Sequence, residues 1–241
     1  MSLLPFFALV SASALAGNRT VNSSGAALGW QLDVVPYTID PDGKHGLDVD
    51  EVVDAINTSA AQWQLEGSWI ELVYEGEVDA DESAYNDIHE IFFVDEWSAK
   101  LDPNLLALTY VWSQSDGEIL HFDIAINADD HAWGTAGEED RNDLSNAMTH
   151  EFGHALGFDH SEIEEATMFS RTSTGETSKR DLAEDDMALF ADLYGGSFPF
   201  SELGGMSCST VRGGPAGLAA ALSLLVVFAR RRADTFTVEL T

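Results

Sequence analysis

The segment HEFGHALGFDH, residues 150–160, constrains the fold of this chain more than any other feature. It places three of the chain's seven histidines within eleven residues. Residues four apart lie on the same face of an α-helix, so His150 and His154 can direct their imidazoles at a single point. Gly157 then lets the chain leave the helix in a left-handed conformation, and His160 can approach from the opposite side. The sequence therefore predicts three imidazoles around one centre.

Three neutral imidazoles would leave the fourth position of a tetrahedral zinc open, as in catalytic rather than structural zinc sites. Glu151 lies about 100° further round the helix, where it can take a proton from a water whose pKa zinc lowers to roughly 7. Once protonated, the same carboxyl can deliver that proton to a departing amine. The alternative, a helix with surface histidines, leaves Gly157 and His160 unexplained. The pattern thus predicts hydrolysis of peptide bonds.

The five fixed positions resemble those of the metzincin zinc peptidases, in which a methionine in a tight turn lies under the zinc. Met168 follows His160 by eight residues, a spacing typical of that group; a core methionine is the alternative. HEFGHALGFDHS is similar to the matrixin branch, the matrix-metalloproteinase-like metzincins, in a bacterial form. VPYTIDPDG, HFDIAINADDHAWGT and LAEDDMALFADLYG extend the resemblance over residues 29–196. It implies one catalytic zinc ion on His150, His154 and His160, with Glu151 as the general base and acid and Met168 in the Met-turn.

The chain also departs from the matrixin pattern. Animal matrixins hold a second, structural zinc, but Leu108 or a neighbour stands where one of its histidines would be, although His121 lies in the matching segment. We therefore expect no structural zinc. Asp123 falls where matrixins bind calcium, so the resemblance allows a Ca²⁺ site there. Family propeptides block the zinc with a cysteine, whereas the single cysteine here, Cys208, lies beyond the domain, so we expect no such latency.

Hydrophobic periodicity predicts an α+β domain: a twisted mixed sheet of about five strands with three helices. Strands are predicted at 34–40, 69–78, 88–95, 105–113 and 118–127, the last with Leu120, Phe122, Ile124 and Ile126 facing the core. One helix follows Asp48 or Asp50 and carries the apolar stripe Val52, Ile56, Ala60 and Trp63. The histidine helix follows Asn142 or Asp143 as its N-cap. The last helix is expected from Lys179 to Tyr194, with Ala183, Met187, Phe190 and Tyr194 on one stripe.

The two ends of the chain lie outside that domain. Residues 1–16 read as a secretory signal peptide ending in Ala14-Leu15-Ala16, with a buried N-terminal helix as the alternative, and 17–28 form a short N-terminal segment. Residues 197–214 read as a Gly/Ser-rich linker around Cys208, and 215–232 as a short membrane helix with an arginine cluster, followed by a tail at 233–241. The arrangement resembles the tripartite, myxobacterial-like surface-sorting tags that are cut near the cysteine. A plain membrane anchor and a core helix are the alternatives.

The composition excludes several partners. Lys and Arg number 11 against 42 Asp and Glu, a net charge of −31, and such a surface repels nucleic acid and anionic membranes. Contact with a membrane is therefore expected only through the C-terminal segment. One cysteine excludes an intrachain disulfide.

These features together predict an exported, monomeric zinc endopeptidase, secreted or associated with the cell surface or outer membrane. Its protein or peptide substrate would lie extended along an edge strand, LLALTYVWS at 105–113, and residues 169–181 would wall the pocket after the cleaved bond. Two other classes stay open. One is a surface-displayed metal-binding adhesion module with a non-catalytic site, and the other is a calcium-stabilised shell protein.

Overall fold

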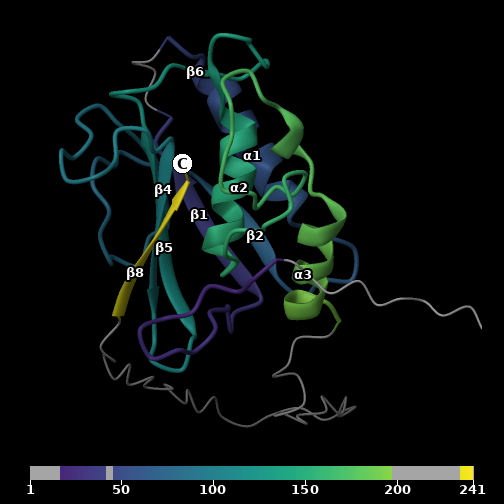
Figure 1. Ribbon diagram of the computed structural model, residues 1–241. Helices are drawn as coiled ribbons and strands as arrows, with labels where there is room; N and C mark the ends of the chain where they lie inside the picture. The colour runs from purple at the N-terminus through teal and green to yellow at the C-terminus, as the bar shows by residue number, and fades with distance from the viewer. Residues whose placement is uncertain (1–16, 42–45, 197–233, 241) are drawn as a thin grey trace, which may run out of the picture.

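The computed structural model describes residues 17–41, 46–196 and 234–240 (Figure 1). The predicted signal peptide, the linker with Cys208 and the predicted membrane helix with its arginine cluster, 215–232, lie outside these described residues. Within them, no helix has both the length and the apolar character needed to span a membrane.

A mixed sheet runs through the domain in the order β2-β1-β3-β5-β4-β8. Its strands are β1 Val34–Ile39, β2 Glu71–Glu77, β3 Glu90–Val94, β4 Ala107–Ser113, β5 Ile119–Asn127 and β8 Asp234–Leu240. The pairs from β2 to β5 are parallel, while β4 is antiparallel to both β5 and β8. The five domain strands confirm the predicted sheet. The sixth, β8, was not predicted and covers the outer edge of β4.

Three helices lie together on one face of this sheet (Figure 1): α1 Val49–Gln62, α2 Leu144–Ala155 and α3 Glu184–Tyr194. Asp48, rather than Asp50, is the N-cap of α1, and its carboxylate accepts from the amide of Asp50 at 3.0 Å. The predicted stripe of α1 is confirmed, because all four of its residues are at most 1% exposed: Val52, Ile56, Ala60 and Trp63.

Helix α2 is buried on every side, since all twelve of its residues are buried. Side-chain donors reach main-chain carbonyls at its C-terminal end: Trp30 Nε1 donates to the oxygen of Ala155 at 2.9 Å, and the hydroxyl of Tyr194 donates to that of Leu156 at 2.6 Å. These bonds satisfy groups that a helix leaves unpaired at its end. They fix α2 between the N-terminal part of the domain and α3.

The predicted start of the last helix is wrong, and its predicted stripe is confirmed only in part: Phe190 and Tyr194 are buried, whereas Ala183 is half-buried and Met187 is exposed. Residues 178–180 form a separate 3₁₀ turn, Ser178–Arg180, and α3 begins only at Glu184. The amide of Lys179 donates to Asn146 Oδ1 at 2.7 Å, which ties this segment to α2. Met187 is 37% exposed, and Leu189 is buried in its place.

The loop between β5 and α2 also holds structure that was not predicted. The short strands β6 Trp133–Gly134 and β7 Asn142–Asp143 pair in parallel on either side of the acidic stretch. On β5 itself, Phe122, Ile124 and Ile126 face the core as predicted, while Leu120 is only half-buried.

Candidate metal centre

The first turn of α2 is held by charge as well as by a cap. Asp143, the N-cap, accepts from the amide of Asn146 at 2.9 Å. Its carboxylate also pairs with the guanidinium of Arg180, whose Nε donates to Oδ1 at 2.8 Å. The helix that carries the histidines is therefore anchored at its start to the segment that follows Met168.

Gly157 ends the helix as predicted, with φ +93°. A side chain could not replace its hydrogen, because a Cβ there would lie 2.9 Å from the carbonyl oxygen of Leu28. The chain turns back after it and brings the ring of His160 to 5.3 Å from His150 and 4.9 Å from His154, centroid to centroid. One ligand atom from each histidine lies within 4.8 Å of the others, so the structure brings the three predicted ligands together.

Hydrogen bonds set the tautomer of two of these rings. Nδ1 of His150 lies 2.7 Å from the carbonyl oxygen of Thr167, and Nδ1 of His154 lies 2.8 Å from that of Phe158. A carbonyl only accepts, so both Nδ1 atoms carry the proton and both Nε2 atoms keep a lone pair. The two Nε2 atoms face each other at 2.9 Å. Two facing lone pairs repel unless a cation lies between them, so this donor set fits a zinc ion.

Burial keeps these imidazoles neutral. It lowers the pKa of His150 well below the usual range and that of His154 to about 3, and the neighbouring histidines add to both shifts. Since the neutral ring is the form that binds a metal, the environment suits the ligands to their predicted role.

Glu151 is fully buried beside them. Its Oε2 accepts a hydrogen bond from the hydroxyl of Thr109 in β4, and its Oε1 has no hydrogen-bond partner among the described residues. Burial raises the pKa of Glu151 to about 8, against the opposing effect of the Thr109 bond. A positive ion at the histidines would favour the ionised carboxylate.

Met168 lies under α2 in a tight turn. Its side chain is 1% exposed, and its carbonyl accepts from the amide of Ser161 at 2.8 Å, which closes the loop after the third histidine. Asp186 of α3 fixes the turn, because its carboxylate accepts from the amides of Thr167 at 2.7 Å and Met168 at 3.0 Å. No motif or spacing marked Asp186 in advance, beyond its place in the segment similar to matrixins.

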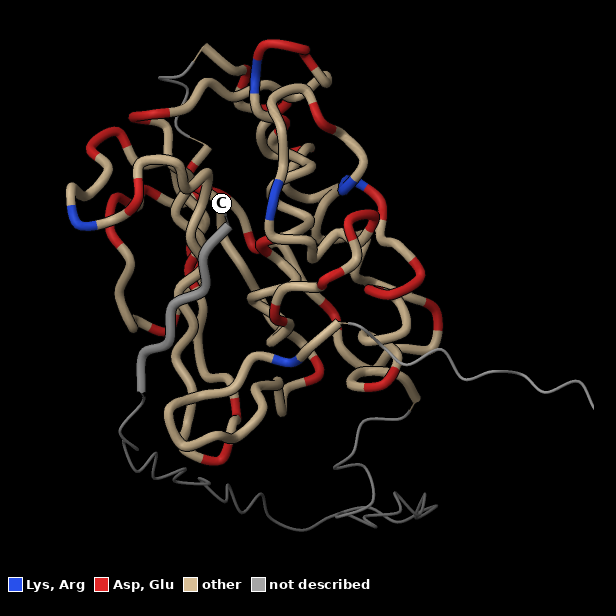
Figure 2. The backbone as a smooth tube through the Cα atoms, viewed as in Figure 1, with Lys and Arg blue, Asp and Glu red and all other residues tan. Residues whose placement is uncertain are grey.

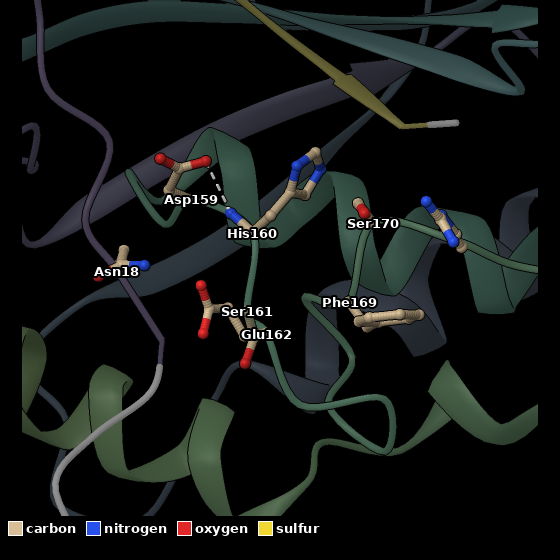
Figure 3. A pocket seen from close by; sticks show the side chains of 8 residues that line it. Asn18, Asp159, His160, Ser161, Glu162, Phe169 and Ser170 are labelled. Carbon is tan, nitrogen blue, oxygen red and sulfur yellow. Dashed lines mark hydrogen bonds between the residues drawn. The ribbon is translucent and has the colours of Figure 1, made fainter.

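A cavity of about 510 Å³ opens beside His160. Figure 3 shows the ring of His160 pointing away from Glu162 and toward α2. Phe169 and Ser170 lie on the neighbouring segment of the chain. Phe169, Ser170 and Arg171 come from the segment expected to wall a pocket, and all three line this cavity.

Asp123, the candidate calcium ligand, is fully buried away from solvent. Its two oxygens accept from the amides of Glu90 and Ala84, both at 3.0 Å, and Oδ1 lies 3.1 Å from Nε2 of His121. Its carboxylate therefore already has protein partners, and a Ca²⁺ site at Asp123 stays a prediction.

The model of the matrixin family of peptidases matches residues 29–195. The chain belongs to the matrixin family. Among curated proteins it is 31% identical to metalloendoproteinase 1-MMP of Arabidopsis thaliana over 173 residues, 69% of this chain and 44% of that protein. It is 46% identical to metalloendoproteinase 5-MMP of the same plant over 55 residues, 23% of this chain and 15% of that protein. The chain thus spans less than half the length of these curated relatives.

Membership confirms the predicted family and α+β fold and makes residues 29–195 a metalloendopeptidase domain of the kind that uses zinc. His150, Glu151, His154 and His160 all lie within the residues that match the family.

Proposed function

We propose that this chain is an exported zinc-dependent endopeptidase. The observation that carries the proposal is the convergence of three buried or half-buried imidazoles beside a buried carboxylate that has one oxygen without a partner among the described residues. Its support comes from the matrixin match over 29–195. A zinc ion held by His150, His154 and His160 would supply a Lewis acid for the substrate carbonyl and lower the pKa of water.

Proton transfer is proposed for the side chain of Glu151. Glu151 takes a proton from the attacking water at Oε1 and passes it to the nitrogen of the departing amine. The carboxylate and the two helix imidazoles lie in a buried site, because Glu151, His150 and His154 are all 0% exposed. The Nδ1 bonds to main-chain carbonyls keep the two helix imidazoles in one orientation throughout.

The substrate is proposed to lie extended and antiparallel along the outer edge of β4. In support, this edge already accepts an antiparallel strand, because β8 pairs with β4 from Ala107 to Ser113. β8 also contacts α2. A substrate strand at this edge would therefore have to displace residues 234–240.

The catalytic assignment is tested with Glu151→Ala and His154→Ala. We expect Glu151→Ala to keep zinc and lose about 10²- to 10⁴-fold in kcat on casein or a peptide, because only proton transfer is removed. His154→Ala should lose zinc and activity together. Zinc content by mass spectrometry and cleavage with and without a chelator give the readout, and Glu164→Ala, at an exposed position, is the matched control.

Activity that survives Glu151→Ala would remove the proposed base. A zinc-loaded wild-type chain that cleaves nothing would favour the adhesion module instead, and a chain that binds no zinc would overturn both readings.

Export is proposed from residues 1–16, and surface association from the Cys208 motif and the apolar run with its arginine cluster at 215–232, which together resemble a sorting tag. Intact-mass measurement of the protein from its native host tests both: we expect loss of the first sixteen residues and cleavage near Cys208. An uncleaved C-terminus would favour a plain membrane anchor.

A further inference from the structure

A hydroxyl of the sheet touches the carboxylate of the active-site helix. Thr109 lies in β4 and Glu151 in α2, and both side chains are fully buried. Thr109 Oγ1 donates to Glu151 Oε2, while the main-chain oxygen of Glu151 lies further from the same hydroxyl, at 3.4 Å. Because a hydroxyl has one hydrogen to donate, the carboxylate is its principal acceptor.

This bond leaves the two carboxylate oxygens in different situations. Oε2 is held by Thr109, whereas Oε1 is buried with no hydrogen-bond partner within the described part of the chain. The last torsion of a glutamate is broad, so an unheld carboxylate rotates about it easily. A base must meet its proton donor within about 2.6–3.2 Å, so free rotation would spread Oε1 over unproductive positions.

We propose that Thr109 is a positioning residue for Glu151: its hydroxyl holds Oε2 so that Oε1 is presented in one direction to the reacting water. The inference rests on the peptidase function proposed above and deepens it. It also links the base to β4, the strand along which the substrate is proposed to lie.

Packing alone does not account for a threonine here. The neighbouring residues Leu108 and Val111 on β4 are aliphatic and fully buried, and valine is similar in shape to threonine and, like threonine, enriched in strands. Burying a hydroxyl costs free energy unless it has a hydrogen-bond partner. The partner that compensates this hydroxyl is the carboxylate of Glu151.

The test compares Thr109→Val, which replaces the hydroxyl with a methyl group, with Thr109→Ser, which keeps the hydroxyl. In the zinc-loaded full chain we expect Thr109→Val to lower kcat about ten- to hundredfold with KM within about twofold of wild type, because a misplaced base slows chemistry but not binding. Thr109→Ser should keep kcat within about threefold of wild type. Zinc per chain and the unfolding midpoint are measured on the same samples.

Thr38→Val is the matched control, because Thr38 is a strand threonine of β1 whose hydroxyl donates to the carbonyl of His89. It should leave kcat unchanged. A wild-type kcat in Thr109→Val, or an equal loss in Thr109→Ser, overturns the positioning role, as does a loss of zinc that tracks the loss of kcat. If wild type itself cleaves nothing while holding zinc, the failure lies in the proposed function.

Discussion

Gly153 lies where α2 crosses the Met-turn, and its missing side chain makes that crossing possible. A Cβ at this position would come within 2.2 Å of the sulfur of Met168 and 2.9 Å of Cζ2 of Trp63. Real Cβ atoms do not approach other atoms so closely, so the side chain of Met168 packs against α2 as it does because residue 153 is glycine.

Gly153→Ala is therefore expected to destabilise the protein, although alanine normally stabilises a helix interior by roughly 0.5–1 kcal/mol over glycine. We expect the free energy of unfolding to fall by about 1–3 kcal/mol, the usual cost of overpacking a core. Denaturant unfolding of the zinc-loaded protein measures it. Thr58→Ala, on the exposed side of α1, is the control and should not lower stability.

If Gly153→Ala were as stable as wild type, the close approach of Met168 to α2 would not be a constraint. Recovery of part of the lost stability in the double variant Gly153→Ala, Met168→Ala would locate the strain at the sulfur.

At this scale the sequence predicted the histidines, Glu151, Gly157 and Met168, because they sit within nineteen residues of one another at helical and turn spacings. Thr109 and Asp186 could not be predicted in the same way. Thr109 lies 42 residues from Glu151 and Asp186 lies 18 from Met168, and each acts through a side chain whose direction depends on how whole elements pack. Local periodicity carries no information about such contacts.

At the scale of elements, β4 is the strand that contacts both the histidine helix α2 and the C-terminal strand β8. Its strand neighbours are β5 on one side and β8 on the other, with Thr109 opposite Val238. If substrate uses the same edge, β8 competes with it.

Deletion of residues 234–241 should therefore lower KM by about three- to tenfold with kcat unchanged, because the competent edge would be free in a larger fraction of molecules. Steady-state cleavage of a peptide by the full and the truncated chain measures the change. Val238→Pro keeps the length but disrupts strand pairing, and should have the same effect. Equal KM values in all three proteins would contradict competition at this edge.

The elements differ in how far sequence could place them. The five domain strands and α1 follow from strong periodicity and clear caps, and their boundaries fall within two residues of the prediction. The start of α3 was set too early, because Lys179 and Arg180 look helical in isolation but are held by Asn146 and Asp143. β8 was read as a tail, since a single short run does not reveal its partner strand.

At the scale of the whole molecule, the dominant electrostatic feature is the formal net charge of −31. Figure 2 shows acidic positions in loops on all sides of the tube and few basic ones among them. Arg171, which lines the cavity beside His160, is a local exception.

We expect this field to favour basic substrates at low salt. Peptides that carry Lys or Arg several residues from the cleaved bond should have lower KM than matched Asp or Glu peptides, and the difference should shrink as the Debye length falls to about 3 Å near 1 M salt. Placing the peptide's charges several residues from the cleaved bond separates the effect of the overall negative field from that of a local contact with Arg171. Equal KM values at low salt would show that the field does not reach the substrate.

The pairing of residues 234–240 with β4 finally has a topological consequence, because main-chain hydrogen bonds cannot be made through a lipid bilayer. If Arg230, Arg231 and Arg232 were to hold the last residues on the opposite face of a membrane from the domain, the outer edge of β4 would be bare. A chain with both on the same face can keep that edge covered. Insertion of the C-terminal segment into a membrane would then anchor the domain and, by the same event, remove residues 234–240 from the outer edge of β4.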